Sequence, residues 1–340
     1  SEPTEIYIAY DSDHLYFGFY AHYSDPSIMR ANRVDRDRAS QDDLLTIYFD
    51  TFMDQQRSYD FDVNAYNVQG DGIINIAGRR GRGSGIPFAD RTWDTLFDSG
   101  AQIVEDGFTA EMAIPFKSLR YPQQPEGVPH RWGFQIVREI QDKDNETNVW
   151  APISRDVAGF LPQMGVLDGM TDLSTSRNLE ILPTMTAINF GSLDTATGDF
   201  NVLDTSPEGG INFKYGVTSN LTADFTVNPD FSQVESDESQ IDVNTRYALS
   251  VEEKRPFFLE GGELFGQRIQ TFYSRRIADI QGGGKLLGKQ GPWAMHLLAT
   301  RAEPLKTGSS AGYTVARVQR DVAARSTVGA LFANRTLDGR

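Results

Sequence analysis

The sequence predicts an all-β protein, and three observations predict this class. Aromatic residues make up 11% of the 340 residues, and 31 glycines and 15 prolines divide the chain into short segments. Most of these segments alternate apolar and polar residues, which is the period of a β-strand. Aromatic side chains also favour strands over helices. We therefore expect antiparallel strands joined by polar turns, in a first domain over residues 1–175 and a second over residues 176–340.

Seven short segments of the first half have the pattern of strands. The segment from Ser58 to Tyr66 alternates most regularly, with Tyr59, Phe61 and Val63 on the face opposite Asp60. Short strands of this number, separated by polar turns, favour an antiparallel β-sandwich. The expected strands cover residues 5–10, 14–22, 44–50, 58–66, 101–105, 108–114 and 132–140.

Several phrases of the first half resemble the family-9 carbohydrate-binding domains. They include LYFGFYAHYSDP, DDLLTIYFDT, YDFDVNAYNVQGDG and WGFQIVREI. The resemblance spans about residues 4 to 170. It implies a β-sandwich that binds a polysaccharide or oligosaccharide, and members of that family hold a sugar between two tryptophans and carry structural calcium.

Two tryptophans of this half are the candidate carbohydrate ligands. A sugar ring stacks on a flat aromatic face that is held open in a loop or at a sheet edge. Trp93 and Trp150 lie in loop-like segments, whereas Trp132 shares a strand face with Phe134 and is expected in the core. Packing beneath a loop stays the alternative for both candidates.

An acidic cluster is the candidate calcium site. Calcium prefers six to eight oxygen ligands, which carboxylates supply. The four candidate ligands are Asp35, Asp37, Asp42 and Asp43. The spacing does not fit an EF-hand loop, and a solvated loop in which these aspartates pair with neighbouring arginines stays the alternative.

A segment rich in Gly, Pro, Ser and Thr, from Ala158 to Ser176, precedes a second series of alternating segments. In the clearest of them Ile211, Phe213 and Tyr215 share one face. A strand of this kind fits a sheet whose two faces meet an apolar and a polar environment. Further segments with the pattern of strands cover residues 178–190, 221–227, 293–300, 312–319 and 327–335.

Three phrases of the second half, NPDFSQVE, EKRPFFLEG and FYSRRI, resemble in order and spacing a bacterial outer-membrane β-barrel family of unassigned function. The barrel of that family follows a domain similar to the family-9 carbohydrate-binding modules. The resemblance implies localisation to the cell outer membrane, with lipid around the second half. The family has a longer barrel, so we expect an incomplete barrel in this chain and a signal sequence already removed.

Composition and charge exclude several function classes. The net charge is −15, and twelve basic against four acidic residues after Gln267 leave −23 for the first 267 residues. So acidic a region disfavours nucleic acid as a partner. The chain has no cysteine, which excludes disulfides and thiol catalysis. Gly283 to Lys289 resembles a phosphate-binding loop, but Gln290 replaces the required Ser or Thr and the flanks have the pattern of strands.

These observations favour a non-catalytic protein that binds glycan at the outer membrane and aids polysaccharide capture or uptake. No hydrolase motif is present, and no catalytic carboxylate pair can be chosen among 47 acidic residues. Glu111, on the polar face of a strand, is the first candidate for such a role. Two alternatives stay open: an accessory module of a glycoside hydrolase in carbohydrate catabolism, and a structural or transport barrel that does not bind sugar.

Overall fold

A computed structural model gives the fold of the chain as two compact units, formed mainly by residues 1–176 and 177–340. Each unit is described by itself. The structure describes residues 2–75, 85–91, 93–141, 145–174, 179–193, 197–198, 200–218, 220–229, 253, 255–259, 261, 265, 271–277, 280–302, 310–323 and 326–337. Among these residues no helix is long and apolar enough to cross a membrane.

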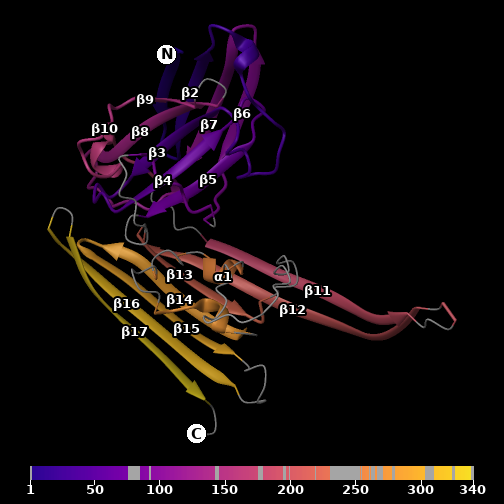
Figure 1. The fold of residues 1–340 in the computed structure, drawn as a ribbon. Coiled ribbons are helices and arrows are strands. Elements are labelled where there is room, and N and C mark those ends of the chain that lie inside the picture. The colour runs from indigo at the N-terminus through magenta and orange to yellow at the C-terminus, as the bar shows by residue number, and fades with distance from the viewer. Residues whose placement is uncertain are drawn as a thin grey trace. The chain divides into compact units, whose positions relative to one another are not determined.

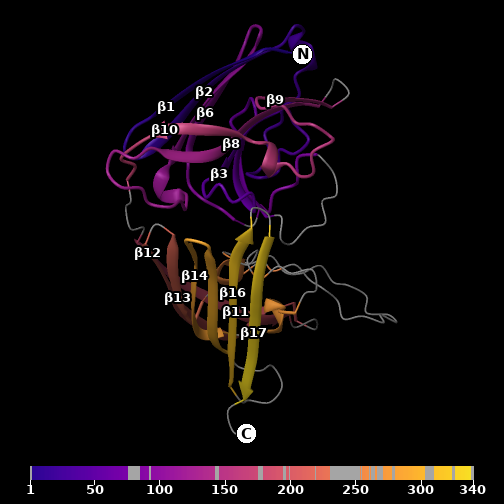
Figure 2. The ribbon, with the colours of Figure 1, turned by 90° about the vertical axis from the view of Figure 1, so that its left-hand side faces the viewer.

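The first unit contains two antiparallel sheets that lie face to face (Figures 1 and 2). The smaller sheet has the strand order β1-β2-β7-β6. Its strands are β1 (Thr4–Tyr10), β2 (His14–His22), β6 (Asp98–Val104) and β7 (Gly107–Pro115).

The larger sheet has the order β10-β8-β3-β4-β5, and β9 pairs with the same strand β8. Its strands are β3 (Leu44–Asp50), β4 (Arg57–Val63), β5 (Gln69–Asn75), β8 (His130–Ile140), β9 (Glu146–Val149) and β10 (Gly165–Met170). Sequence analysis predicted β3, β4 and β8 but not β5, β9 or β10. The strand β9 has only four residues, and β5 and β10 contain glycines that weaken the strand pattern.

The core of this unit lies between the two sheets. Phe17 of β2 packs against Phe49 of β3 and Phe134 of β8, with ring centroids 5.9 Å apart in both pairs. Trp132 is fully buried in the same cluster, as its place on the strand predicted. Because the inward residues of both sheets are large and apolar, their burial stabilises the sandwich. The all-β class and the antiparallel sandwich predicted from the sequence are confirmed.

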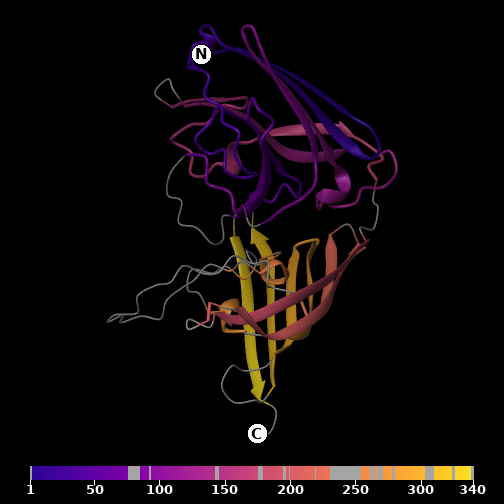
Figure 3. The ribbon, with the colours of Figure 1, turned by 90° about the vertical axis from the view of Figure 1, so that its right-hand side faces the viewer.

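The second unit contains one curved antiparallel sheet of seven strands in chain order (Figure 3). Among the described residues its edge strands do not pair with each other, so the sheet is open. In the sequence the alternation of this segment is clearest from Ile211 onward, whereas β12 already begins at Phe200. The strands are β11 (Leu179–Leu193), β12 (Phe200–Thr218), β13 (Leu221–Val227), β14 (Ile280–Gln290), β15 (Trp293–Ala302), β16 (Ala311–Ala323) and β17 (Ser326–Leu337).

The two faces of this sheet differ in polarity. One face exposes apolar side chains, among them Phe225 of β13 and Leu297 of β15. The opposite face buries polar ones, among them Thr226 and Thr300. The predicted phosphate-loop-like segment lies within β14, so it is a strand and has no loop to cradle a phosphate.

Two of the three recognised phrases of this half meet on the buried polar face, next to the short helix α1 (Pro256–Leu259). Arg255 donates from Nη1 to the carbonyl of Ile277 (2.6 Å) and from Nη2 to the carbonyl of Ser274 (2.9 Å). The phrase NPDFSQVE lies mostly outside the described residues. Through these contacts the Arg255 side chain of EKRPFFLEG joins that phrase to the backbone of FYSRRI.

Candidate functional site

The candidate site lies on the outer face of the larger sheet of the first unit. Alternation along β4 places Phe61 in the core and Asp60 and Asp62 on the other face. The register sets Asp62 beside Thr46 and Asp60 beside Tyr48. Unlike an ordinary solvated face, these residues are buried. Burying carboxylates is costly unless they are paired or used, which makes this face a functional candidate.

Two glycines of β5 make room for the carboxylates. A Cβ at Gly70 would lie 2.5 Å from an oxygen of Asp62, and a Cβ at Gly72 would lie 2.9 Å from an oxygen of Asp60. Both distances are shorter than a carbon–oxygen contact allows. Gly70 lies opposite Asp62 and Gly72 lies opposite Asp60 across the strand pair. The two carboxylates therefore require glycine at both positions.

Arg91 is the counter-ion of this pair. Its Nη2 lies 3.1 Å from Oδ2 of Asp60 and 2.6 Å from Oδ2 of Asp62. The remaining atoms are less well satisfied: among the described residues, Oδ1 of Asp60 and Nη1 of Arg91 are buried and have no hydrogen-bond partner. A buried acceptor and a buried donor of this kind are ready to bind a polar ligand.

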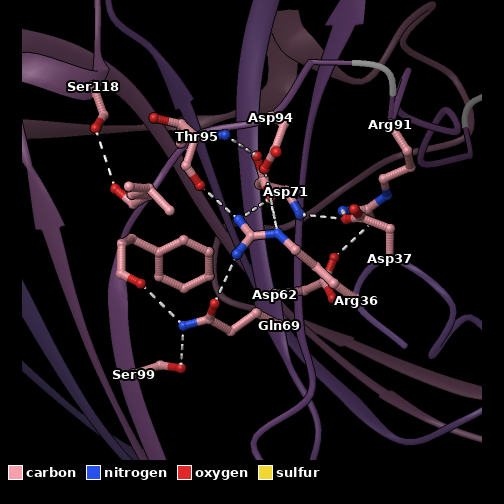
Figure 4. Close-up of polar contacts among 12 residues, drawn as sticks. Arg36, Asp37, Asp62, Gln69, Asp71, Arg91, Asp94, Thr95, Ser99 and Ser118 are labelled. Atoms are coloured by element: carbon pink, nitrogen blue, oxygen red, sulfur yellow. Dashed lines mark hydrogen bonds and ion pairs between the residues drawn. The ribbon is translucent and has the colours of Figure 1, made fainter. Parts of the chain in front are cut away.

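A second arginine fixes the wall beside them (Figure 4). Arg36 contacts the buried carboxylate of Asp71 and donates to the carbonyl of Thr95 (2.6 Å) and to Oε1 of Gln69 (2.8 Å). The backbone N–H of Thr95 in turn donates to Oδ2 of Asp71 (2.8 Å). These bonds join the segments around Arg36 and Thr95 to β5, so the loops that surround the aspartates are held in one arrangement.

Burial shifts the pKa values of the acidic groups on this face. It raises the pKa of Asp60 to about 7 and that of Asp71 to about 6, in both cases against the opposing effect of an arginine. Burial also raises the pKa of Asp62 and Glu139. Desolvation of the charged form is the common cause.

The carboxylates line a pocket of about 470 Å³, which we call the acidic pocket. Among the described residues, its lining includes the acidic residues Asp37, Asp60, Asp62, Glu139 and Glu146 and the cation Arg91. Phe88, at its rim, has 87% of its surface exposed. A pocket with an exposed aromatic ring and several buried acceptors suits a ligand that has both an apolar face and hydroxyl donors.

The structure places the two predicted tryptophans outside the lining of this pocket. Trp93 packs against Tyr59 (ring centroids 5.0 Å apart) and Phe61 (6.0 Å) and is partly buried on the core cluster. Trp150 is 52% exposed beside Gly165, with one edge toward Phe134. Trp150 therefore keeps the open face that stacking needs, and sugar contact by either ring stays a prediction.

The four predicted calcium ligands do not share one centre. Asp42 accepts hydrogen bonds from Asn32 and Asn64, and Asp43 accepts from the Tyr23 hydroxyl (2.7 Å). Asp37 faces Arg91, and Asp35 is exposed. Within the described ranges no group of three or more acidic or histidine side chains is placed to hold a metal ion. Calcium binding stays a prediction.

Sequence reasoning missed Asp60, Asp62 and Arg91 as site residues. The aspartates alternate with apolar residues and were assigned to a polar strand face, because alternation does not reveal whether a face is covered. A signal was nevertheless present: the phrase that contains both aspartates also contains Gly70 and Gly72. Paired glycines on the next strand indicate a close approach.

The comparisons with known proteins agree with this division of the chain. A family model described as "Carbohydrate family 9 binding domain-like" matches residues 3–156, and one described as "Domain of unknown function (DUF5916)" matches residues 179–285. The first part of the chain is therefore similar to the family-9 carbohydrate-binding domains, and residues 179–285 are similar to the second family.

One solved structure is similar to part of the chain. It is a crystal structure of a "putative carbohydrate-binding protein" from Bacteroides uniformis, with 13% sequence identity and a TM-score of 0.39. The match covers 49% of this chain and 78% of that one. No curated protein matches this chain.

Proposed function

We propose that this protein binds glycan at the bacterial outer membrane without catalysis, with the acidic pocket as its sugar site. The observation that carries the proposal is the pocket itself, whose lining includes the exposed ring of Phe88 and the buried Oδ1 of Asp60, which has no hydrogen-bond partner among the described residues. A pyranose ring has an apolar face that can stack on Phe88 and hydroxyl groups that can donate to Oδ1 of Asp60. The match of residues 3–156 to a carbohydrate-binding family supports the same reading.

The geometry of the aspartates favours binding over hydrolysis. Glycoside hydrolysis needs two carboxylates that flank the scissile bond. Asp60 and Asp62 both contact the same nitrogen of Arg91, at 3.1 and 2.6 Å. The guanidinium thus occupies the space between them that a substrate bond would need. Release of reducing ends from a bound oligosaccharide would count against this part of the proposal.

Replacing Phe88 with alanine tests the sugar site. We expect binding of soluble neutral oligosaccharides to weaken about 10-fold or more, because truncating an aromatic ring that stacks on the sugar costs on the order of 2 kcal/mol. Isothermal titration calorimetry against a panel of cello-, xylo-, manno- and malto-oligosaccharides measures the affinity, and circular dichroism checks the fold.

The matched control is Leu96→Ala. Leu96 is 82% exposed in the same unit and does not line the pocket, so its loss should leave affinity unchanged. Equal effects of the two variants, or no binding across the panel by the unaltered chain, would refute the pocket as the sugar site. The variant Trp150→Ala, in the same titration, tests the tryptophan expectation.

The outer-membrane part of the proposal rests on the seven-stranded sheet. Its exposed face carries apolar side chains, while its other face buries polar side chains such as Thr226 and Thr300 beside the apolar Leu298 and Val315. The exposed apolar residues include Ile211, Phe225, Val227, Trp293, Met295, Leu297 and Val318. A large exposed apolar surface needs a cover, and a sheet that is apolar on one face and polar on the other is the pattern of strands that face lipid.

Site-directed labelling tests lipid contact, because the chain has no cysteine of its own. We expect a nitroxide on Leu297→Cys, in the chain reconstituted into vesicles, to be accessible to oxygen and shielded from a water-soluble nickel complex. A label on Leu96→Cys, on an exposed residue of the first unit, should show the opposite preference. If both labels are equally accessible to the nickel complex, the sheet does not face lipid.

A further inference from the structure

A second hollow lies on the outer face of the smaller sheet of the first unit, away from the acidic pocket. It has a volume of about 560 Å³, and its lining includes Tyr7, Tyr16, Gly18, Gly100 and Glu111. We call it the tyrosine groove. None of its lining residues lines the acidic pocket, so the proposal below does not depend on the function of that pocket.

Strand register builds the groove. Tyr7, Gly18, Glu111 and Gly100 lie side by side across β1, β2, β7 and β6. Glycine on both sides of Glu111 leaves the space above its carboxylate open. A Cβ added at Gly100 would meet nothing within 4 Å, so glycine at this position is not demanded by packing within the described chain.

The two tyrosines are held at their hydroxyl ends. The hydroxyl of Tyr7 donates to Oε2 of Glu5 (2.8 Å), and that of Tyr16 donates to Oδ2 of Asp11 (2.8 Å). These bonds restrict each ring while 64% of Tyr7 and 38% of Tyr16 stay exposed. Aromatic rings that are fixed in advance bind a ligand with a smaller loss of side-chain entropy.

Glu111 decides the kind of occupant. Its side chain is exposed, and in the described part of the chain it makes no hydrogen bond or ion pair. An apolar partner would bury this carboxylate without a donor, which is costly. An anionic ligand would be repelled by Glu111 and by Asp98, which lines the same groove. An uncharged sugar avoids both penalties, because its hydroxyls donate to the carboxylates while its apolar face stacks on the tyrosines.

We propose that the tyrosine groove is a second glycan site, which takes an uncharged oligosaccharide chain. Together with the acidic pocket it gives one sandwich two sugar-binding surfaces, one on each sheet. Two sites on one domain raise the avidity for a polysaccharide that can engage both.

Blocking the groove is the direct test. Gly100→Val adds a side chain where a Cβ would meet nothing within 4 Å, and valine is a β-branched residue that suits a strand, so we expect the fold to be kept. We expect it, and Tyr16→Ala, to weaken binding of cello-, xylo-, manno- or maltohexaose at this groove at least 10-fold. The control Gln102→Val changes the same strand β6 outside the groove and should have no effect.

Glycine-selective ¹⁵N labelling of the whole chain reports both sites in one titration. The amides of Gly18 and Gly100 report the groove, and those of Gly70 and Gly72 report the acidic pocket. A shift of Gly18 that is lost in Gly100→Val, and shifts of both Gly18 and Gly100 that are lost in Tyr16→Ala, support the proposal, whether or not Gly70 and Gly72 shift. Hexasaccharides that leave Gly18 and Gly100 unchanged, or a tetralysine peptide that shifts them where no hexasaccharide does, overturn it.

Discussion

Replacing Asp60 with asparagine should stabilise the sandwich at pH 8 and weaken sugar binding at the same time. Burial raises the pKa of the Asp60 carboxyl from 3.8 to about 7, although Arg91 opposes the shift. An acid whose pKa is raised by folding favours the folded state below its unfolded pKa, and this contribution is lost as the pH rises through the folded value. The native chain therefore loses stability between about pH 4 and pH 7, whereas asparagine carries no charge to desolvate.

The expected gain at pH 8 is about 2–4 kcal/mol in the free energy of unfolding, from a shift of about three pKa units. At pH 4 most of the gain should vanish, because the aspartate is then protonated in the folded state and close to half protonated in the unfolded state. Urea unfolding followed by tryptophan fluorescence at the two pH values measures the difference, since three of the four tryptophans lie in this unit. Asp156→Asn, at an exposed position, is the matched control and should change neither value.

The same variant should weaken oligosaccharide binding about 10-fold, because a charged acceptor is replaced by a weaker neutral one. Groups in a functional pocket often destabilise the folded state while they bind the ligand, and we expect Asp60 to be such a group. Unchanged stability at pH 8 would show that the desolvation cost of the buried Asp60 carboxylate is already compensated in the native chain. Stabilisation with unchanged affinity would show that Asp60 does not contact the sugar.

Replacing Lys285 with methionine should destabilise the second unit by about 3 kcal/mol, the loss expected when one partner of a buried ion pair is removed. Lys285 of β14 lies opposite Asp224 of β13, with Nζ 3.0 Å from Oδ2. Both side chains are nearly fully buried, 4% and 10% exposed. Nζ also donates to the carbonyl of Phe257 (2.7 Å), so the same ammonium anchors α1 to the sheet.

Hydrogen–deuterium exchange of peptides from β13, β14 and α1 measures this loss. We expect their amides to exchange on the order of 100-fold faster, as a loss of about 3 kcal/mol implies. Lys289→Met, on the same strand but partly exposed, is the control and should change exchange little. Adding Asp224→Leu to Lys285→Met should restore much of the protection, because both charges are then gone. Equal exchange in the two lysine variants would show that the pair does not hold the face together.

Two segments show how far sequence reasoning reaches in this chain. The pattern of β3 predicted its bounds, Leu44–Asp50, and its inward Ile47 and Phe49, because strand alternation depends only on neighbouring residues. The short strand β9 was missed, because its four residues contain no alternation that stands out from the turn before it. Trp132 was correctly assigned to the core from its strand face alone.

The sequence by itself determined the all-β class, the buried face of most strands in the first unit and the resemblance of each half to a family. These features depend on the alternation of apolar and polar residues and on short sequence motifs, both of which can be recognised along the chain. Only the tertiary structure decided that the polar face of β4 is covered, that Arg91 lies between Asp60 and Asp62, and that the row from Tyr7 to Gly100 is open. The physical reason is that burial, and with it the pKa of a carboxyl, depends on which segments distant in sequence pack over it.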